Sequence, residues 1–278
     1  DAIMMVNTVR GNVEGYSTRQ AQAAQEAYTA QSRTANQSER DLNLMVRTGS
    51  LRNCPVTPKA LSDAKDIFGP HLPGVRGKTV RQPPTRVNTD TVSIPRDFQR
   101  LHKSVTLVAD VFFVNEIPFL MTISRNIRFV TVECMRERTA DHLGESLNKA
   151  CSLYARASYN VNVILMDMEF ESVASILPHV LCNFAAAREH IHEAEQEIRV
   201  FKERCRGTLT TLPLKRHPRR VIIETVHFTA LWRNVVPSKV GISQLYSPRE
   251  ILTGTYLDYN KHCILDFGEY VEVHDEPS

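Results

Sequence analysis

The chain of 278 residues lacks the long apolar run that a membrane-spanning helix requires. Such a helix needs roughly 18 or more consecutive apolar residues, and no apolar stretch here reaches that length. We therefore expect no membrane partner. The hydrophobic content of 42% is nevertheless enough to form a real core, in one large domain or two small ones.

Paired cysteines are also absent. The six cysteines are far apart in the sequence, and none forms a Cys-x-x-Cys motif: Cys54, Cys134, Cys151, Cys182, Cys205 and Cys263. This pattern fits reduced thiols in an intracellular protein better than a disulfide framework. It also gives no support to a cysteine-based zinc site.

A strong net charge is missing as well. The formal net charge is only +3, so the total charge argues weakly for a nucleic-acid partner and the distribution of charge matters more. The sequence opens with Asp1 rather than Met, and we expect it to be a piece of a longer polypeptide.

The first third of the chain predicts little regular structure. Residues 1–36 have few large apolar side chains, so we expect a marginal surface helix or a disordered arm that adds little to the core. Ser38 opens a capping box for one short helix, and Thr57 with Pro58 caps a second helix that Gly69 closes. Residues 70–97 contain five prolines and several basic residues, which is typical of a positively charged linker.

The pattern changes at residue 104, where three strand-like runs follow one another at 104–114, 117–123 and 128–134. Their short connections predict an antiparallel meander. A helix should begin near Thr139 and lead to a strand at 161–166, which its crossover connection should make parallel to the first strand. A short strand near 180–184 and a charged helix over 189–206 complete an α/β pattern with a mixed sheet flanked by helices.

Three carboxylates stand out in this region: Asp110, Asp167 and Glu195. An ionised Asp inside a buried strand costs several kcal/mol unless it is hydrogen-bonded, paired or bound to a cation. Asp110 and Asp167 would lie side by side if their strands pair, and a shared divalent metal would explain both. This combination suggests metal-dependent phosphodiester chemistry.

Each carboxylate also has a structural interpretation. Asp110 can be a paired strand residue, and Asp167 can mark the solvated end of a strand. Glu195 can lie on the solvated face of a charged helix. His190 and His192 raise the alternative of zinc, but residues two apart diverge on a helix and no cysteine pair stands nearby.

A basic cluster gives the best nucleic-acid signal. It runs from the charged helix into the next segment and comprises Arg199, Lys202, Arg204, Arg206, Lys215, Arg216, Arg219 and Arg220. Such cations bind phosphates and position DNA without reading its sequence. Because Glu197 and Glu203 interrupt the cluster, a solubilising surface is the alternative. The following helix, over 221–236, is best explained by packing.

Several spaced motifs resemble the integrase region of copia-type retrotransposon polyproteins. The core motifs are Val105-Thr-Leu-Val-Ala-Asp110, Ile117-Pro-Phe-Leu-Met-Thr-Ile-Ser-Arg-Asn126, Leu165-Met-Asp-Met-Glu-Phe170 and the segment from Glu189 to Arg204. Downstream, Leu212-Pro-Leu-Lys-Arg216, Trp232-Arg-Asn234 and Tyr246-Ser-Pro-Arg-Glu-Ile251 are similar to the segment that follows the core. Residues 50–82 are similar to the pre-integrase segment, so the resemblance covers roughly residues 45–278.

The resemblance implies a ribonuclease-H-like fold and two Mg²⁺ (or Mn²⁺) ions bound by two Asp and one Glu. By position these are Asp110, Asp167 and Glu195. The implied reaction joins retroelement DNA 3′-ends to target DNA, as a polynucleotidyl transferase. The implied partners are these DNAs and further copies of the chain, in the nucleus by way of a cytoplasmic retroelement particle.

The resemblance also implies a division of the chain. The expected segments are a low-complexity or helical arm at 1–45, a pre-integrase-like helical segment with a basic linker at 46–97, a catalytic core at 98–220 and a C-terminal helical extension at 221–278.

The sequence departs from the family pattern at two motifs. Met168 follows the second Asp where the family has Gly, and His192-Glu-Ala-Glu-Gln196 replaces Pro-Glu-x-Glu-Arg. Glu193 is the alternative third ligand, although it points roughly 200° away from Glu195 around a helix. Two other functions therefore stay open: a decayed or repurposed core that binds DNA without catalysis, and a ribonuclease H or related nuclease on the same fold.

Overall fold

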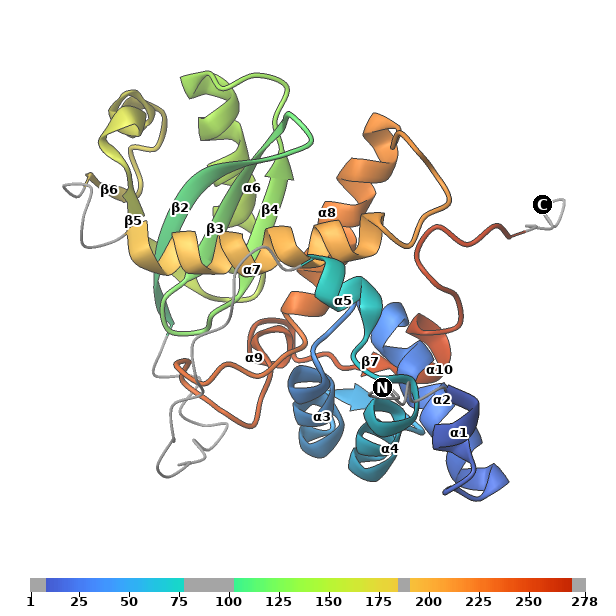
Figure 1. The fold of residues 1–278 in the computed structure, drawn as a ribbon. Coiled ribbons are helices and arrows are strands. Elements are labelled where there is room, and N and C mark those ends of the chain that lie inside the picture. Colours follow the sequence, from blue (N-terminus) through green and yellow to red (C-terminus); the bar gives the residue numbers. More distant parts are fainter. Residues whose placement is uncertain (1–8, 78–102, 185–190, 272–278) are drawn as a thin grey trace, which may run out of the picture.

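The structure, a computed structural model, describes residues 9–77, 103–184 and 191–271 (Figure 1). Most of the predicted basic linker and the side chains of His190 and Glu193 lie outside the described residues. None of the helices in the described ranges is long and apolar enough to cross a membrane.

A five-stranded mixed sheet forms the centre of the larger unit. Its strand order is β4-β3-β2-β5-β6. The strands are β2 (Ser104–Val114), β3 (Ile117–Ser124), β4 (Val130–Cys134), β5 (Asn160–Met166) and β6 (Leu181–Phe184). β2, β3 and β4 form an antiparallel meander, whereas β5 pairs with β2, and β6 with β5, in parallel. The predicted antiparallel meander, the parallel orientation of the strand at 161–166 and the α/β class with a mixed sheet flanked by helices are confirmed.

Alternation along β2 sends successive side chains to opposite faces of the sheet. Leu107 and Ala109 join a core cluster with Leu143 and Leu147 of α6 (Ala140–Arg156). Thr139 caps α6 as predicted, since its side chain accepts a hydrogen bond from the His142 N–H. The short 3₁₀ helix η2 (Met168–Ile176) packs against α6 on this side.

The opposite face of the sheet is covered by α7 (Ile191–Leu209) and α8 (Arg219–Arg233). Val108 and Phe112 of β2 share a cluster with Ile198 and Phe201 of α7. The rings of Phe112 and Phe201 lie 5.6 Å apart, edge to face. Both faces of the sheet are therefore buried under helices, as in the α/β layer architecture.

A second, helical unit lies beside the sheet (Figure 1). It contains α1 (Val9–Val13), α2 (Thr18–Arg33), α3 (Glu39–Thr48), α4 (Pro58–Phe68) and α5 (Leu72–Gly77). The carboxyl-terminal segment returns to it, because β1 (Leu51–Arg52) pairs in parallel with β7 (Leu257–Asp258). Near this ladder lie α9 (Pro248–Thr253) and α10 (Tyr259–His262).

The core of this helical unit corrects one expectation. Ala24, Ala27 and Ala30 of α2 are fully buried, in one cluster with Trp232 of α8 and Leu257 of β7. Residues 1–36 were expected to add little to the core, and that expectation is wrong. Small alanines lower the apolar content of a sequence, but they let helices approach closely enough to exclude water.

The two predicted short helices are present. Ser38 and Thr57 cap α3 and α4, and Gly69 ends α4 with a φ of 75°. α5 was not expected, because it lies in the proline-containing stretch assigned to the linker. The predicted segment boundaries at 45, 97 and 220 stay a prediction, although the helical unit draws its core from residues before 77 and after 230.

Candidate active site

The two candidate Asp residues belong to neighbouring parallel strands, with Asp110 inside β2 and Asp167 directly after the end of β5. In the β2–β5 ladder Val108 is paired with Leu165, and two residues further along each strand stand Asp110 and Asp167. Adjacent strands lie about 4.8 Å apart, so this register places the two backbone positions side by side. The strand pairing on which that prediction depended is present.

Both Asp positions share the face of the sheet that packs on α7. Val108 and Leu165 belong to the cluster that contains Ile198 of α7, and residues two apart on a strand point to the same face. Asp110 and Asp167 are half-buried.

Each Asp also accepts a hydrogen bond from the backbone N–H of the residue that follows it. Asp110 Oδ1 accepts the N–H of Val111 at 2.7 Å, and Asp167 Oδ1 accepts the N–H of Met168 at 2.8 Å. Asp167 thereby caps η2. Charge-assisted hydrogen bonds of this kind offset part of the cost of placing a carboxylate at the edge of the core.

Glu195 lies in the first turns of α7 and is exposed. Only six residues separate Phe184 at the end of β6 from the start of α7 at Ile191, and six residues span little more than 20 Å. α7 therefore begins near the edge of the sheet that carries β5 and β6 (Figure 1). Glu195 is on the same side of the sheet as the two Asp residues.

The flank of α7 that carries Glu195 also carries Lys202, because seven residues make nearly two helical turns. Lys202 Nζ lies 6.0 Å from the centre of the Phe112 ring. Phe112 follows Asp110 by two residues on the same face of β2. This flank of α7 is therefore directed toward β2 rather than toward α8.

Asp110, Asp167 and Glu195 carry the donor atoms of a divalent-metal site. Carboxylate oxygens suit Mg²⁺ and Mn²⁺, and the backbone places Asp110 and Asp167 as neighbours. Within the described ranges, however, no three His, Cys, Asp or Glu side chains lie together as a group that could hold a metal ion. The metal-ligand roles of Asp110, Asp167 and Glu195, and the choice between Glu195 and Glu193, stay predictions.

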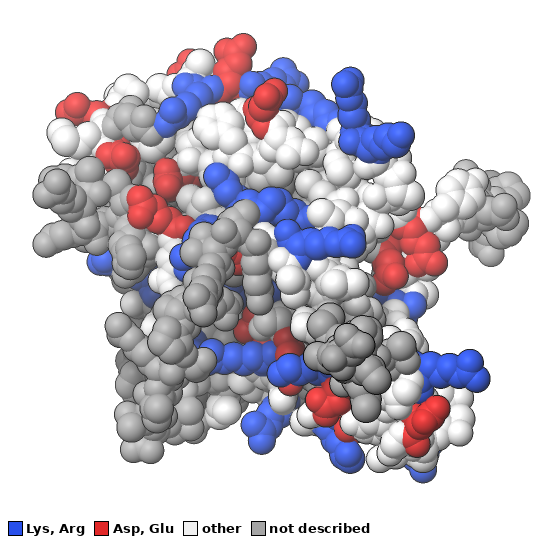
Figure 2. All heavy atoms as spheres, viewed as in Figure 1, with Lys and Arg blue, Asp and Glu red and all other residues white. Residues whose placement is uncertain are grey.

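The basic cluster divides into two groups. Arg199, Lys215, Arg216, Arg219 and Arg220 are exposed and Lys202 is half-buried, although Arg220 also forms an ion pair with Glu224 at 2.7 Å. Figure 2 shows Lys and Arg side chains gathered over α7 and beside α8 on one face of the molecule. This group stays a candidate for phosphate binding.

Arg204 and Arg206 have another role. Arg204 is largely buried and donates hydrogen bonds to Asp41 Oδ2 at 2.5 Å and to the Asn36 carbonyl at 3.2 Å. Arg206 donates through Nε to the Gly77 carbonyl at 3.1 Å. These two predicted DNA-binding side chains instead hold the helical unit against α7.

The ion pair between Glu197 and Arg233 was missed by sequence reasoning. Glu197 on α7 is buried and accepts two hydrogen bonds from Arg233 of α8, one of them at 3.0 Å. Burial alone would raise the pKa of Glu197, but Arg233 more than offsets this and holds the pKa below its ordinary value. The partners are 36 residues apart, so no local pattern signals the pair.

Comparisons with known proteins add little. No protein-family model and no curated protein matches the sequence. Among solved structures, the catalytic core domain of BIV integrase is similar at 14% identity with a TM-score of 0.40, over 54% of this chain and 93% of that chain. A likeness of this size carries no argument about function, and the fold assignment rests on the sheet itself.

Proposed function

We propose that this chain contains an integrase core that joins retroelement DNA 3′-ends to target DNA with the help of divalent cations. One observation carries the proposal: β2 and β5 pair in parallel with Val108 opposite Leu165, and Asp110 and Asp167 each follow that pair by two residues. A divalent cation held by both carboxylates would offset their mutual repulsion.

In this proposal the residues bind and orient the metal ions and the DNA, and none of them forms a covalent bond to the substrate. Asp110 and Asp167 would hold Mg²⁺ or Mn²⁺ with Glu195 as the third ligand, and such ions supply charge neutralisation for the attacking and leaving oxygens of an in-line displacement. The exposed basic group on α7 and beside α8 would hold DNA phosphates. The copia-type resemblance supports retroelement DNA as the substrate, assembly into a homo-oligomer and action in the nucleus.

A second candidate is a core of the same origin that binds DNA without catalysis. It is favoured by the finding that the described side chains do not form a three-ligand metal group. Met168, which is 61% exposed directly after Asp167, also departs from the family motif. A binder of this kind would hold DNA in the presence of a chelator.

The test is strand transfer by the purified chain on a labelled retroelement-end duplex with Mg²⁺ or Mn²⁺. Asp110→Asn and Asp167→Asn keep the size and the hydrogen-bonding capacity of each side chain but remove its charge. We expect each to reduce joined product by roughly two orders of magnitude or more. Asp141→Asn, at an exposed position on α6, is the matched control and should leave the rate unchanged.

The outcomes separate the two candidates. Equal strand transfer by both Asn variants and the wild type would disprove the assigned ligands. DNA bound equally by all the variants and in a chelator, with no product under either metal, would support the non-catalytic core.

A further inference from the structure

Three cations of the basic cluster lie close together in the sequence between α7 and α8. We call Lys215, Arg216 and Arg219 the distal patch. All three are exposed, Lys215 and Arg216 in the loop after α7 and Arg219 at the start of α8. Lys and Arg side chains beside α8 share one face of the molecule with those over α7 (Figure 2). The distal patch therefore presents three positive charges to solvent.

The sheet register relates the distal patch to the carboxylate site. Cys134 at the end of β4 is paired with Phe119 of β3, and Phe119 is paired with Phe112 of β2. These three residues form one row across the sheet, and two strand spacings make the row about 10 Å long. Its inner end at Phe112 lies two residues from Asp110.

One cation lies near each end of this row. Burial raises the pKa of the Cys134 thiol, and Arg219 partly offsets the rise through its charge and a hydrogen bond, which places Arg219 at the outer end. Lys202 Nζ lies 6.0 Å from the centre of the Phe112 ring, at the inner end. Cys134 and Phe112 pack with the cluster on the α7 side of the sheet. Lys202 and the distal patch therefore share that face.

The loop that carries Lys215 and Arg216 is held to the end of α7. His217 donates through Nε2 to the Leu209 carbonyl oxygen at 3.0 Å, and the Leu212 N–H donates to the same oxygen at 3.3 Å. A constrained backbone loses less conformational entropy when its side chains bind a ligand. The two lysine and arginine side chains thus start from a preorganised loop.

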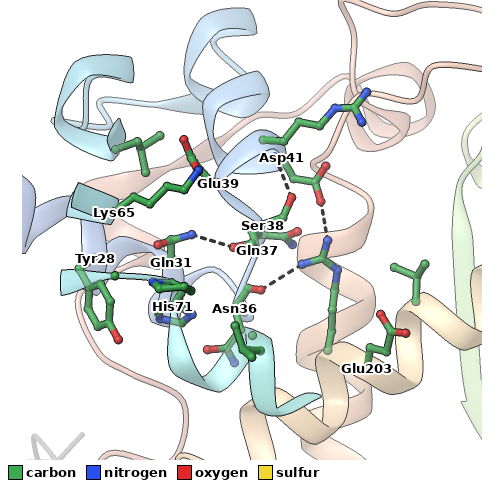
Figure 3. Close-up of a pocket in the computed structure, with 18 of the residues that line it drawn as sticks. Tyr28, Gln31, Asn36, Gln37, Ser38, Glu39, Asp41, Lys65, His71 and Glu203 are labelled. Atoms are coloured by element: carbon green, nitrogen blue, oxygen red, sulfur yellow. Dashed lines mark hydrogen bonds and ion pairs between the residues drawn. The ribbon is translucent and has the colours of Figure 1, made fainter. Parts of the chain in front are cut away.

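Acidic partners are scarce at the distal patch. α8 has no acidic side chain in its first turn, and the first acid along the helix, Glu224, is paired with Arg220 at 2.7 Å. Within the described ranges, no ion pair neutralises the three cations of the patch. The helical unit differs: Figure 3 shows Lys65 beside Glu39, and the two form an ion pair at 3.3 Å.

We propose that the distal patch binds the phosphates of a DNA duplex that Lys202 also contacts, so that one double helix lies along the row. This inference rests on the proposed function, because it specifies the form of DNA that the core holds. The row length of about 10 Å corresponds to roughly three base pairs at 3.4 Å each. A rigid duplex can therefore contact both ends of the row at once.

The composition of the loop favours a duplex over a single strand. Proteins that hold single strands combine cations with aromatic side chains on which the bases stack. Residues 210–220 contain no Phe, Tyr or Trp. Contacts to phosphates alone do not read the base sequence, so we expect the distal patch to hold duplexes of any sequence.

The test measures DNA binding in a chelator, which keeps the result independent of any metal-dependent reaction. Fluorescence anisotropy of the full chain with a labelled duplex, over a salt series, gives the slope of log affinity against log salt concentration. The combined variant Lys215→Ala, Arg216→Ala and Arg219→Ala should reduce this slope by about 2.7, because each phosphate contact contributes about 0.9. The reduction should be the same for a retroelement-end duplex and for an unrelated one.

A second combined variant is the matched control. Arg19→Ala, Arg47→Ala and Lys261→Ala remove three exposed cations from α2, α3 and α10, with the same change in net charge. This variant should keep the wild-type slope. Both combined variants should keep the thermal unfolding midpoint of the wild type, because substitutions of exposed side chains change stability little.

Three results would overturn the proposal. One is an unchanged slope in the distal-patch variant, or an equal reduction in the control variant. Another is an equal loss of affinity for a single strand and for the duplex, which would contradict the assignment to a double helix. The third is competition by poly-glutamate as effective as that by duplex of equal charge, which would assign the patch to an acidic protein. A reduced slope in chelator together with no strand transfer in Mg²⁺ would count against the proposed function only.

Discussion

The two flanks of α7 differ although their acidic residues are only two positions apart. Glu195 is exposed, whereas Glu197 is buried in an ion pair with Arg233. Further along the buried flank, Arg204 binds Asp41 of the helical unit. The flank with Glu197 and Arg204 therefore fastens α7 to α8 and to the helical unit, whereas Glu195 on the other flank stays exposed.

This difference teaches that charge on a helix has no single meaning. An acidic side chain that is buried must be paired, because breaking the pair leaves an uncompensated charge in the core. An exposed acidic side chain contributes little to stability. A substitution there that lowers activity without lowering the free energy of unfolding therefore points to a functional role. Stability and activity measured together can assign each residue to one role.

The largest expected effect is on Glu197. Glu197→Ala leaves Arg233 buried without its partner, and we expect the free energy of unfolding to fall by about 3–5 kcal/mol. Glu195→Ala should change it by less than about 0.5 kcal/mol while abolishing strand transfer. Denaturant unfolding of both variants gives the comparison. Equal destabilisation by the two substitutions would show that the flanks do not differ.

The second effect concerns the contact between α5 and α7. A Cβ added at Gly77 would lie 2.1 Å from the Glu203 carbonyl oxygen. This is a steric clash, and backbone atoms must move to relieve it. We expect Gly77→Ala to cost about 1–3 kcal/mol of unfolding free energy, as overpacking does. At Gly15 nothing lies within 4 Å of the added carbon.

Gly15→Ala is therefore the matched control for Gly77→Ala, and it should leave the unfolding midpoint within error of the wild type. If both substitutions were equally neutral, α5 would not dock on α7 through Gly77.

These contacts also show what the sequence could predict. Apolar runs in β2 and β3 with a short connection specify strands whose pairing is local. Ser38 and Thr57 specify helix starts through hydrogen bonds within three residues. The parallel pairing that sets Asp110 beside Asp167 followed from the length of the crossover. Such signals act over short or geometrically fixed distances.

What the sequence could not predict depends on contacts between distant segments. Arg199 and Arg204 are both arginines on α7. Arg204 binds Asp41, which lies 163 residues earlier in the chain. Gly77 stands in a stretch whose prolines and basic residues are typical of a linker. Its lack of a side chain allows α5 to approach the backbone of Glu203 in α7 closely. The alanines of α2 gave no strong apolar signal in the sequence, because their burial depends on packing against distant segments such as α8 and β7.

The smallest expected effect is on DNA binding by Arg199, which is exposed on α7. If Arg199 binds a phosphate, Arg199→Ala should weaken DNA binding about equally across sequences and reduce the slope of log affinity against log salt concentration by about 1. Arg47→Ala, at an exposed position on α3 in the helical unit, should leave that slope unchanged. Fluorescence anisotropy over a salt series measures both. Equal reductions would place DNA on both units, and the exposed flank of α7 would then have no special part in holding it.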